Sequence, residues 1–304
     1  MTYVTARRPP LLQNRITVEE TIQVVRHAED AAKSRARALI IPREHGAWGL
    51  LMVPLFTGIA AGSGSAQQLL PQLLFVAAAF ALFWLRTPVE SLLASGTMTA
   101  RTPRERRTAV IAAGLLAFAA AASLTVLMWR GRNQTLLWIG VIAALALVVQ
   151  MALRKLGRKL RMFSQLVGAA ALTATAPAAY YLGTGRLDSR GLVLWLANWL
   201  FAWNQIHFVQ LRIHAARAGS FQEKLFRGKF FFLAQIVLLV ALILITAQHR
   251  ASPLIILAFL PILIRGTRWF FTAQEPLDVK KLGWSEMKQG VAFGILLAIA
   301  FIVR

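Results

Sequence analysis

The sequence predicts an all-α integral membrane protein with about nine transmembrane helices and a cytoplasmic N-terminus. Of its 304 residues, 57% are hydrophobic and only 15% are charged, whereas a soluble domain carries roughly 25% charged residues. The stretches 108–129, 134–153 and 230–247 contain no Asp, Glu, Lys or Arg. Each is close to the ~20 residues that a helix needs to cross a bilayer.

The chain divides into two predicted parts. Residues 1–42 form a basic cytoplasmic extension, in which a capping box at Thr17 and Glu20 predicts a helix from Val18 to about residue 39. This helix either lies on anionic lipid head groups or belongs to a solvated tail. Residues 43–304 form the transmembrane domain, with spans at 46–62, 69–86, 108–129, 134–153, 162–183, 191–211, 230–247, 251–265 and 289–304.

Two of these spans are short. The eighth and ninth are re-entrant or tilted if they do not cross fully, and Pro253 and Pro261 weaken the eighth. The second span can continue beyond Arg86 as a cytoplasmic helix.

The basic residues predict the orientation. Cytoplasmic segments of this topology hold 28 of the 34 Lys and Arg residues, as the positive-inside rule requires. We therefore expect a multi-pass protein of the bacterial inner (plasma) membrane, with the lipid bilayer as its partner and its longer loops facing the cytoplasm. The net charge of +22 is spread between apolar spans, so no nucleic-acid partner is expected. The chain lacks cysteine, which excludes disulfides and thiolate sites.

Polar residues at the start of the first span form one candidate site. Arg43, Glu44 and His45 precede Trp48 at the cytoplasmic interface, and polar groups at this depth are costly enough to suggest a function. The alternative is an interfacial anchor, with Trp48 in the aromatic belt and Arg43 reaching the head groups.

The sixth span carries a denser polar group. Asn204 and His207 share a helix face with His214, and Gln205 and Arg212 lie beside them. Such a face should point into the bundle. It lines a ligand cavity or supplies hydrogen bonds between helices.

Three further candidates lie near the same membrane surface. Arg86 and Glu90 begin an Arg-rich loop that either binds phosphate or carboxylate groups or serves only as a topology signal. Gln165 enters the fifth span, where small residues favour tight helix packing. No cofactor is expected: a haem iron held by His45 and His207 lacks paired-histidine spacing, and no metal site is predicted.

The stretch Pro42–Gly58, PREHGAWGLLMVPLFTG, resembles the YwiC-like family of bacterial membrane proteins. That family has no established activity to transfer to this chain. A more distant resemblance is to the UbiA superfamily of intramembrane prenyltransferases, carried by Arg43–Gly58, Ala100–Arg107, Arg154–Gly183 and Trp195–Arg212. It implies a nine-helix bundle with a cytoplasm-facing site.

The UbiA resemblance implies two Asp-rich motifs that hold Mg²⁺ and a diphosphate, and both are missing. Only Glu90 stands at the place of the first motif, and Gln205, His207 and Arg212 stand at the second. Because Mg²⁺ needs carboxylate oxygens, we expect the scaffold without Mg²⁺-dependent chemistry.

Three functions follow from the sequence. The first is a protein that binds an isoprenoid lipid or quinone-type ligand in a cytoplasm-facing polar pocket. The second is a UbiA-like transferase acting on an isoprenoid substrate, and the third is a small-molecule transporter. The sequence leaves open whether the protein is an enzyme.

Overall fold

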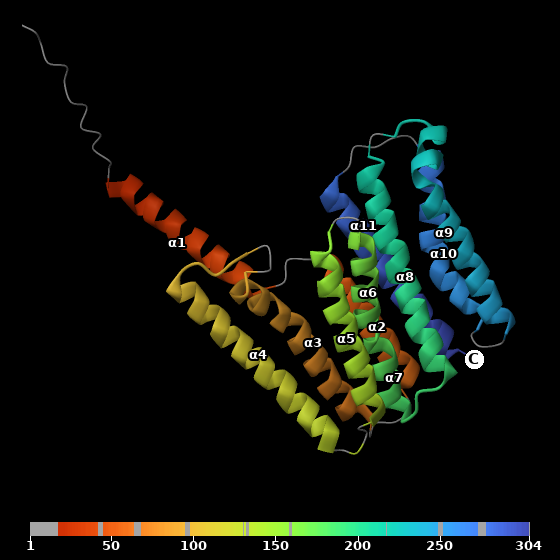
Figure 1. Cartoon of the computed structure of the whole chain (residues 1–304), viewed down its shortest axis with the longest axis horizontal. Helices are drawn as coiled ribbons and strands as arrows, with labels where there is room; N and C mark the ends of the chain where they lie inside the picture. The colour runs from red at the N-terminus through yellow and green to blue at the C-terminus, as the bar shows by residue number, and fades with distance from the viewer. Residues whose placement is uncertain are drawn as a thin grey trace, which may run out of the picture. The chain divides into compact units, whose positions relative to one another are not determined.

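The computed structural model is helical in the part of the chain that it describes. It describes residues 18–41, 45–63, 68–94, 98–129, 131, 134–157, 160–216, 218–248, 252–272 and 278–303, and these ranges contain no strand. Their helices, drawn in Figure 1, are α1 (Val18–Ile40), α2 (His45–Gly62), α3 (Leu69–Leu92), α4 (Pro103–Trp129), α5 (Gln134–Lys155), α6 (Arg161–Thr173), α7 (Thr175–Thr184), α8 (Ser189–His214), α9 (Phe221–Ala247), α10 (Leu254–Phe271) and α11 (Val279–Ile302).

The chain forms two compact units. The first combines Met1–Pro42 with Trp84–Gly114, and the second combines Arg43–Phe83 with Leu115–Arg304. These units are defined by packing between residues and not by membrane topology. The predicted boundary at residue 42 between a cytoplasmic extension and a transmembrane domain therefore stays a prediction.

In the first unit, the end of α1 is fixed to residues around the α3–α4 connection. The Arg35 guanidinium pairs with the Glu105 carboxylate and also donates to the Thr99 carbonyl at 3.3 Å. The Trp84 indole donates to the Ile40 carbonyl at 2.8 Å. Glu105 also accepts from the first backbone N–H groups around the start of α4, so one carboxylate serves as both a helix cap and an ion-pair partner.

The second unit is a helical bundle with an aromatic centre. Phe293 of α11 stacks on Phe201 of α8, with ring centroids 3.9 Å apart, and meets Phe259 of α10 edge-on at 5.1 Å. Glycines bring α2 and α7 into backbone contact, because a Cβ on Gly183 would lie 2.2 Å from the Gly62 carbonyl oxygen. Asn198 of α8 donates to Thr57 of α2 at 3.0 Å inside this bundle.

The predicted fifth span is interrupted. The sequence predicts one span over residues 162–183, but α6 ends at Thr173 and α7 begins at Thr175. Pro177 explains the break, because it has no N–H to donate to the carbonyl four residues earlier. The indoles of Trp195 and Trp199 donate to the carbonyls of Ala170 and Leu166 at 3.1 Å each, which ties α6 to α8.

Seven segments of the described chain are long and apolar enough to cross a membrane: α3, α4, α5, α6 with α7, α9, α10 and the 280–302 part of α11. The eighth and ninth predicted spans are therefore longer than expected, since both reach full spanning length. The apolar part of α2, Trp48–Gly62, is shorter, and α8 is not among the seven. The predicted number of nine spans and the cytoplasmic N-terminus stay predictions.

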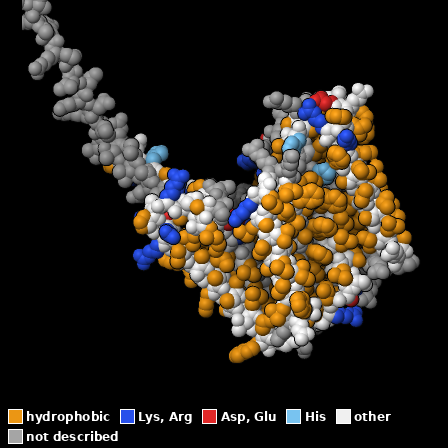
Figure 2. All heavy atoms as spheres, in the orientation of Figure 1, with side chains coloured by type: hydrophobic (Ala, Val, Ile, Leu, Met, Phe, Trp, Pro, Cys, Tyr) orange, Lys and Arg blue, Asp and Glu red, His pale blue; other side chains and the backbone are white. Residues whose placement is uncertain are grey.

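The outer surfaces of these helices are apolar. Figure 2 shows hydrophobic side chains over most of the visible face of the bundle. Large exposed side chains such as Leu145 on α5 and Leu233 on α9 belong to this surface. A soluble protein rarely exposes so much contiguous apolar area. Together with the seven candidate spans, this surface indicates a multi-pass membrane protein.

Candidate functional site

A group of polar side chains lies inside the second unit, where the C-terminal half of α8 meets α9, α10 and α11. We call it the polar cluster, and it consists of Trp203, Asn204, His207, Gln235, Arg265, Glu286 and Gln289. Asn204 and Gln235 are buried, with 7% and 4% of their surface exposed. Polar groups buried in an apolar bundle are costly unless each finds a partner.

An ion pair forms the centre of the polar cluster. Nη1 of Arg265 on α10 pairs with Oε1 of Glu286 on α11, and these side chains are only 14% and 12% exposed. The Gln205 amide of α8 donates to the Glu286 backbone carbonyl at 2.9 Å. The Arg265 guanidinium also lies over the Phe208 ring, 4.2 Å from its centroid, a favourable cation–π distance.

Phe231 of α9 lies between His207 and the α10 backbone next to Gln235. Its ring meets His207 edge-on at 5.2 Å and lies 5.7 Å from the Phe208 ring. A Cβ on Gly266 would lie 3.1 Å from both the Phe231 ring and the Gln235 amide nitrogen. The glycine therefore lets these two side chains lie directly against the α10 backbone.

The polar cluster contains buried polar atoms that have no hydrogen-bond partner among the described residues. The donors are Nε and Nη2 of Arg265, Nε2 of Gln235 and Nε1 of Trp203. The acceptors are Oδ1 of Asn204, Oε1 of Gln235, Oε2 of Glu286 and Oε1 of Gln289, and Nδ1 of His207 takes either role. A buried polar atom without a partner costs about 1–3 kcal/mol, and more when it is charged. Such a concentration fits a site built for a polar partner.

Cations outnumber carboxylates at this end of the bundle. Arg212 on α8 interacts electrostatically with both Arg265 and Glu286. Nearby, the buried Lys224 donates to the carbonyls of Trp269 and Thr272 at 3.2 and 2.5 Å, so its charge neutralises the C-terminus of α10.

A cavity of about 330 Å³ opens beside Lys224. Its walls come from the α8–α9 connection and from the facing ends of α9 and α10: Gly219, Phe221, Lys224, Phe270, Phe271 and Thr272. The ring of Phe270, which lines the cavity, lies 6.4 Å from the ring of Phe231, which in turn contacts His207 of the polar cluster.

The structure brings several predicted site residues to this region. Asn204 and His207 belong to the polar cluster, Gln205 holds the Glu286 backbone, and Arg212 acts on the ion pair. Gln165 of α6 accepts a hydrogen bond from Gln210 of α8 at 3.2 Å, which joins two helices at the same end.

The other predicted site residues do not join this group. Trp48 packs against the Phe80 and Phe83 rings of α3 at 6.1 and 5.0 Å. Arg86 and Glu90 belong to the first unit and pair with each other at 2.8 Å. Arg43 and Glu44 lie outside the described residues, as does the side chain of His45.

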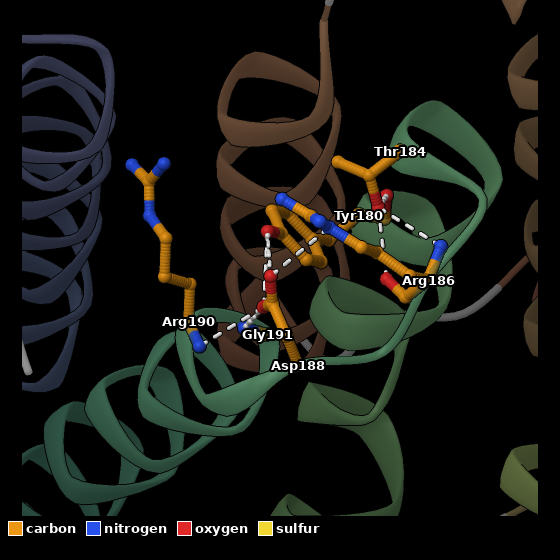
Figure 3. A network of polar contacts seen from close by, with 6 residues as sticks. All are labelled: Tyr180, Thr184, Arg186, Asp188, Arg190 and Gly191. Atoms are coloured by element: carbon orange, nitrogen blue, oxygen red, sulfur yellow. Dashed lines mark hydrogen bonds and ion pairs between the residues drawn. The ribbon is translucent and has the colours of Figure 1, made fainter.

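A second polar network lies at the opposite end of α8 (Figure 3). The Asp188 carboxylate accepts from the backbone N–H groups of Arg190 and Gly191 and from the Tyr180 hydroxyl at 3.0 Å. The Arg190 guanidinium donates to the Phe301 carbonyl near the end of α11 at 2.7 Å. Because each of these groups completes a helix terminus, we interpret the network as structural.

Comparison with known proteins finds a similarity in the N-terminal part of the chain. Residues 41–180 match the family model described as YwiC-like protein. Over these residues the chain is similar to YwiC-like proteins. The match contains the Pro42–Gly58 stretch from which the resemblance was predicted. No curated protein and no solved structure matches the chain.

The polar cluster lies after the matched residues, so the family match does not describe it. The UbiA-like arrangement stays a prediction, since no solved structure supports it. Within the described ranges, no three His, Cys, Asp or Glu side chains lie close enough together to hold a metal ion. The proposed lack of Mg²⁺ chemistry also stays a prediction.

Sequence reasoning missed the partners of α8 in this site. The eighth predicted span ends at Arg265 and the ninth begins at residue 289, but α10 continues to Phe271 and α11 begins at Val279, so Arg265 and Glu286 both lie within helices. One available signal was the spacing of Glu286 and Gln289, which places them on one helix face next to an apolar run. Gln235 is a lone polar residue in an uncharged span, and no sequence pattern marks it as part of a site.

Proposed function

We propose that this YwiC-like membrane protein binds an isoprenoid lipid or quinone-type ligand, whose polar head group occupies the polar cluster. The observation that carries the proposal is the set of buried donors and acceptors without partners on α8, α9, α10 and α11. Carbonyl or hydroxyl oxygens of a head group would accept from the donors, and a head-group hydroxyl would donate to the acceptors. Part of the free energy lost by burying these atoms would then be recovered on binding.

The surroundings suit an amphiphile. The Phe208 and Phe231 rings flank the polar cluster and offer apolar surface to a planar or isoprenoid head. The outward face of α9 carries exposed side chains, among them Phe230, Leu233 and Ile236, against which a lipid tail can lie within the bilayer. A ligand pocket of this kind is mostly apolar with a few convergent polar groups.

Binding in this proposal does not depend on Mg²⁺. Arginine takes the place of a metal as the partner of head-group oxygens, and Arg265 and Arg212 provide two cations at the proposed site. The His207 ring would then hydrogen-bond a quinone carbonyl or act as a general base.

The proposal is tested with protein reconstituted in lipid nanodiscs and two neutral probes, decylubiquinone and farnesol. We expect saturable quenching of tryptophan fluorescence by at least one probe, and affinity about tenfold weaker in His207→Ala and Gln235→Ala. His214→Ala is the matched control, since His214 is exposed on the same helix and bonds only its own α8 backbone. Probe affinity that is the same in all three variants as in the parent protein would refute the proposed site. A strict requirement for Mg²⁺ would refute the metal-free mode.

The transferase alternative predicts altered lipids. Deletion of the gene should change the isoprenoid or quinone profile of the membrane if the protein is an enzyme, and a His207→Ala strain should reproduce the change. Unchanged profiles in the deletion strain would exclude catalysis on these lipids and leave binding as the function.

One observation favours transport as a second candidate. The candidate span Arg161–Thr184 is broken between α6 and α7, and broken helices line substrate sites in many secondary transporters. Uptake of a labelled solute into proteoliposomes, with Pro177→Ala as the variant that restores a continuous helix, tests this alternative.

A further inference from the structure

We propose that Arg265 holds an oxyanion, a carboxylate or phosphate group of the ligand, on the Nε–Nη2 edge of its guanidinium. This inference rests on the proposed function, because it places the ligand head group in the same polar cluster. It adds the chemical class of the head group, which the donors and acceptors of the cluster alone leave open.

The free edge of Arg265 has the geometry that oxyanions need. A guanidinium presents its N–H donors in a rigid planar fork, and two parallel donors on one edge match two oxygens of a carboxylate or phosphate. Glu286 occupies only Nη1. Nε and Nη2, which form the side-on edge, are both buried and have no partner within the described part of the chain.

The guanidinium is held in place before any ligand arrives. One face lies over the Phe208 ring, and the Nη1 end pairs with Glu286. Glu286 is itself held through its backbone by Gln205. Because contacts on α8 and α11 already fix the cation, the Arg265 side chain loses less conformational entropy when its free edge forms two parallel bonds with a ligand.

The charges favour an anion over a neutral oxygen. Arg265, Arg212 and Glu286 interact with one another, and two cations against one carboxylate leave a local excess of one positive charge. An anionic head group would neutralise this excess in a low-dielectric interior, where an unpaired charge is costly. The free carboxylate oxygen Oε2 of Glu286 and Oε1 of Gln289 would accept from a hydroxyl or an acidic proton of the same head group.

The test compares a phosphate-bearing isoprenoid with its neutral alcohol in nanodiscs. We expect farnesyl monophosphate to bind at least about tenfold more tightly than farnesol. Arg265→Lys retains the charge but removes the fork, and it should abolish most of the preference for farnesyl monophosphate over farnesol. Arg268→Lys, at an exposed position on the same helix, is the matched control and should behave like the parent protein.

Inorganic phosphate distinguishes the two sources of the oxyanion. Competition by millimolar phosphate against farnesyl monophosphate supports a site that accepts free oxyanions, and lack of competition supports one that needs the lipid tail. Equal binding of farnesyl monophosphate and farnesol by the parent protein would overturn the inference, whether or not Arg265→Lys folds. That result would leave the proposed function standing, whereas failure of decylubiquinone, farnesol and farnesyl monophosphate to bind would remove both.

Discussion

Replacement of Glu286 by Gln tests the buried ion pair most directly. The substitution keeps the size and shape of the side chain but removes the negative charge next to Arg265. Both side chains are at least 86% buried, so solvent screens the remaining cation poorly. A Gln amide oxygen can still accept one hydrogen bond from Nη1, but the guanidinium charge is then uncompensated.

The expected cost follows from that burial. Removal of one partner of a buried pair typically destabilises a protein by about 3–5 kcal/mol. The retained hydrogen bond places Glu286→Gln near the lower end of this range. At roughly 2–4 °C per kcal/mol for a large domain, a loss of about 3 kcal/mol should lower the midpoint of thermal unfolding by roughly 6–12 °C.

Tryptophan fluorescence during a thermal scan measures this effect, because the chain has nine tryptophans and no cysteine for thiol dyes. Glu223→Gln is the matched control. Glu223 also pairs with an arginine, Arg227, but this pair lies on the helix surface with side chains 39% and 43% exposed. Exposed pairs of this kind contribute about 0.3–0.5 kcal/mol, so the control midpoint should hardly change.

A double substitution completes the experiment. Arg265→Met with Glu286→Leu removes both charges and fills the space with apolar atoms, so it should be no less stable than the parent protein. The reasoning is refuted if Glu286→Gln is as stable as Glu223→Gln. It is also refuted if the double variant is less stable than Glu286→Gln alone, since the charges would then stabilise the fold themselves.

Three further predictions concern the scaffold. Gly183→Ala should destabilise the bundle by about 1–3 kcal/mol, because its Cβ would meet a backbone carbonyl of α2; Gly140→Ala, which meets nothing within 4 Å, should be stabilising or neutral in the same thermal scan. Trp199→Phe loses its hydrogen bond to α6 and should cost about 1 kcal/mol, with a loss of protection of α6 amides in hydrogen exchange. The pKa of Asp278 is held below its ordinary value because its carboxylate accepts hydrogen bonds from N–H groups of the first turn of α11. This helix cap should therefore be intact at neutral pH and weaken as the pH falls through the lowered pKa. A pH titration of the unfolding midpoint should detect this dependence, and Asp278→Ala should remove it.

The helices of the bundle were predictable because the bilayer leaves few alternatives. A segment in hydrocarbon must satisfy its own backbone hydrogen bonds, so a long apolar run is a helix. Each predicted span coincides with helical residues for this reason. The break between α6 and α7 depends on Pro177, but the sequence alone did not distinguish a kinked helix from two helices.

The candidate site was only half predictable. The helical period of α8 alone predicts that Asn204 and His207 lie on one face of the helix. Arg265 and Glu286 resembled topology signals, because a count of charged residues cannot separate a cation at the membrane surface from one that pairs inside the bundle. The partners of α8 depend on tertiary packing among α9, α10 and α11, and no local pattern predicts which helix faces meet.

The ion pair between Arg35 of α1 and Glu105 of α4 limits the order in which the first unit can assemble during synthesis. Arg35 and Glu105 are 70 residues apart, and α2 and α3 lie between them. During synthesis, Arg35 therefore leaves the ribosome well before its partner exists. The hydrogen bond from Trp84 of α3 to Ile40 can form first, whereas the ion pair with Glu105 can form only after the start of α4 has emerged, so this pair marks the completion of the first unit during biogenesis.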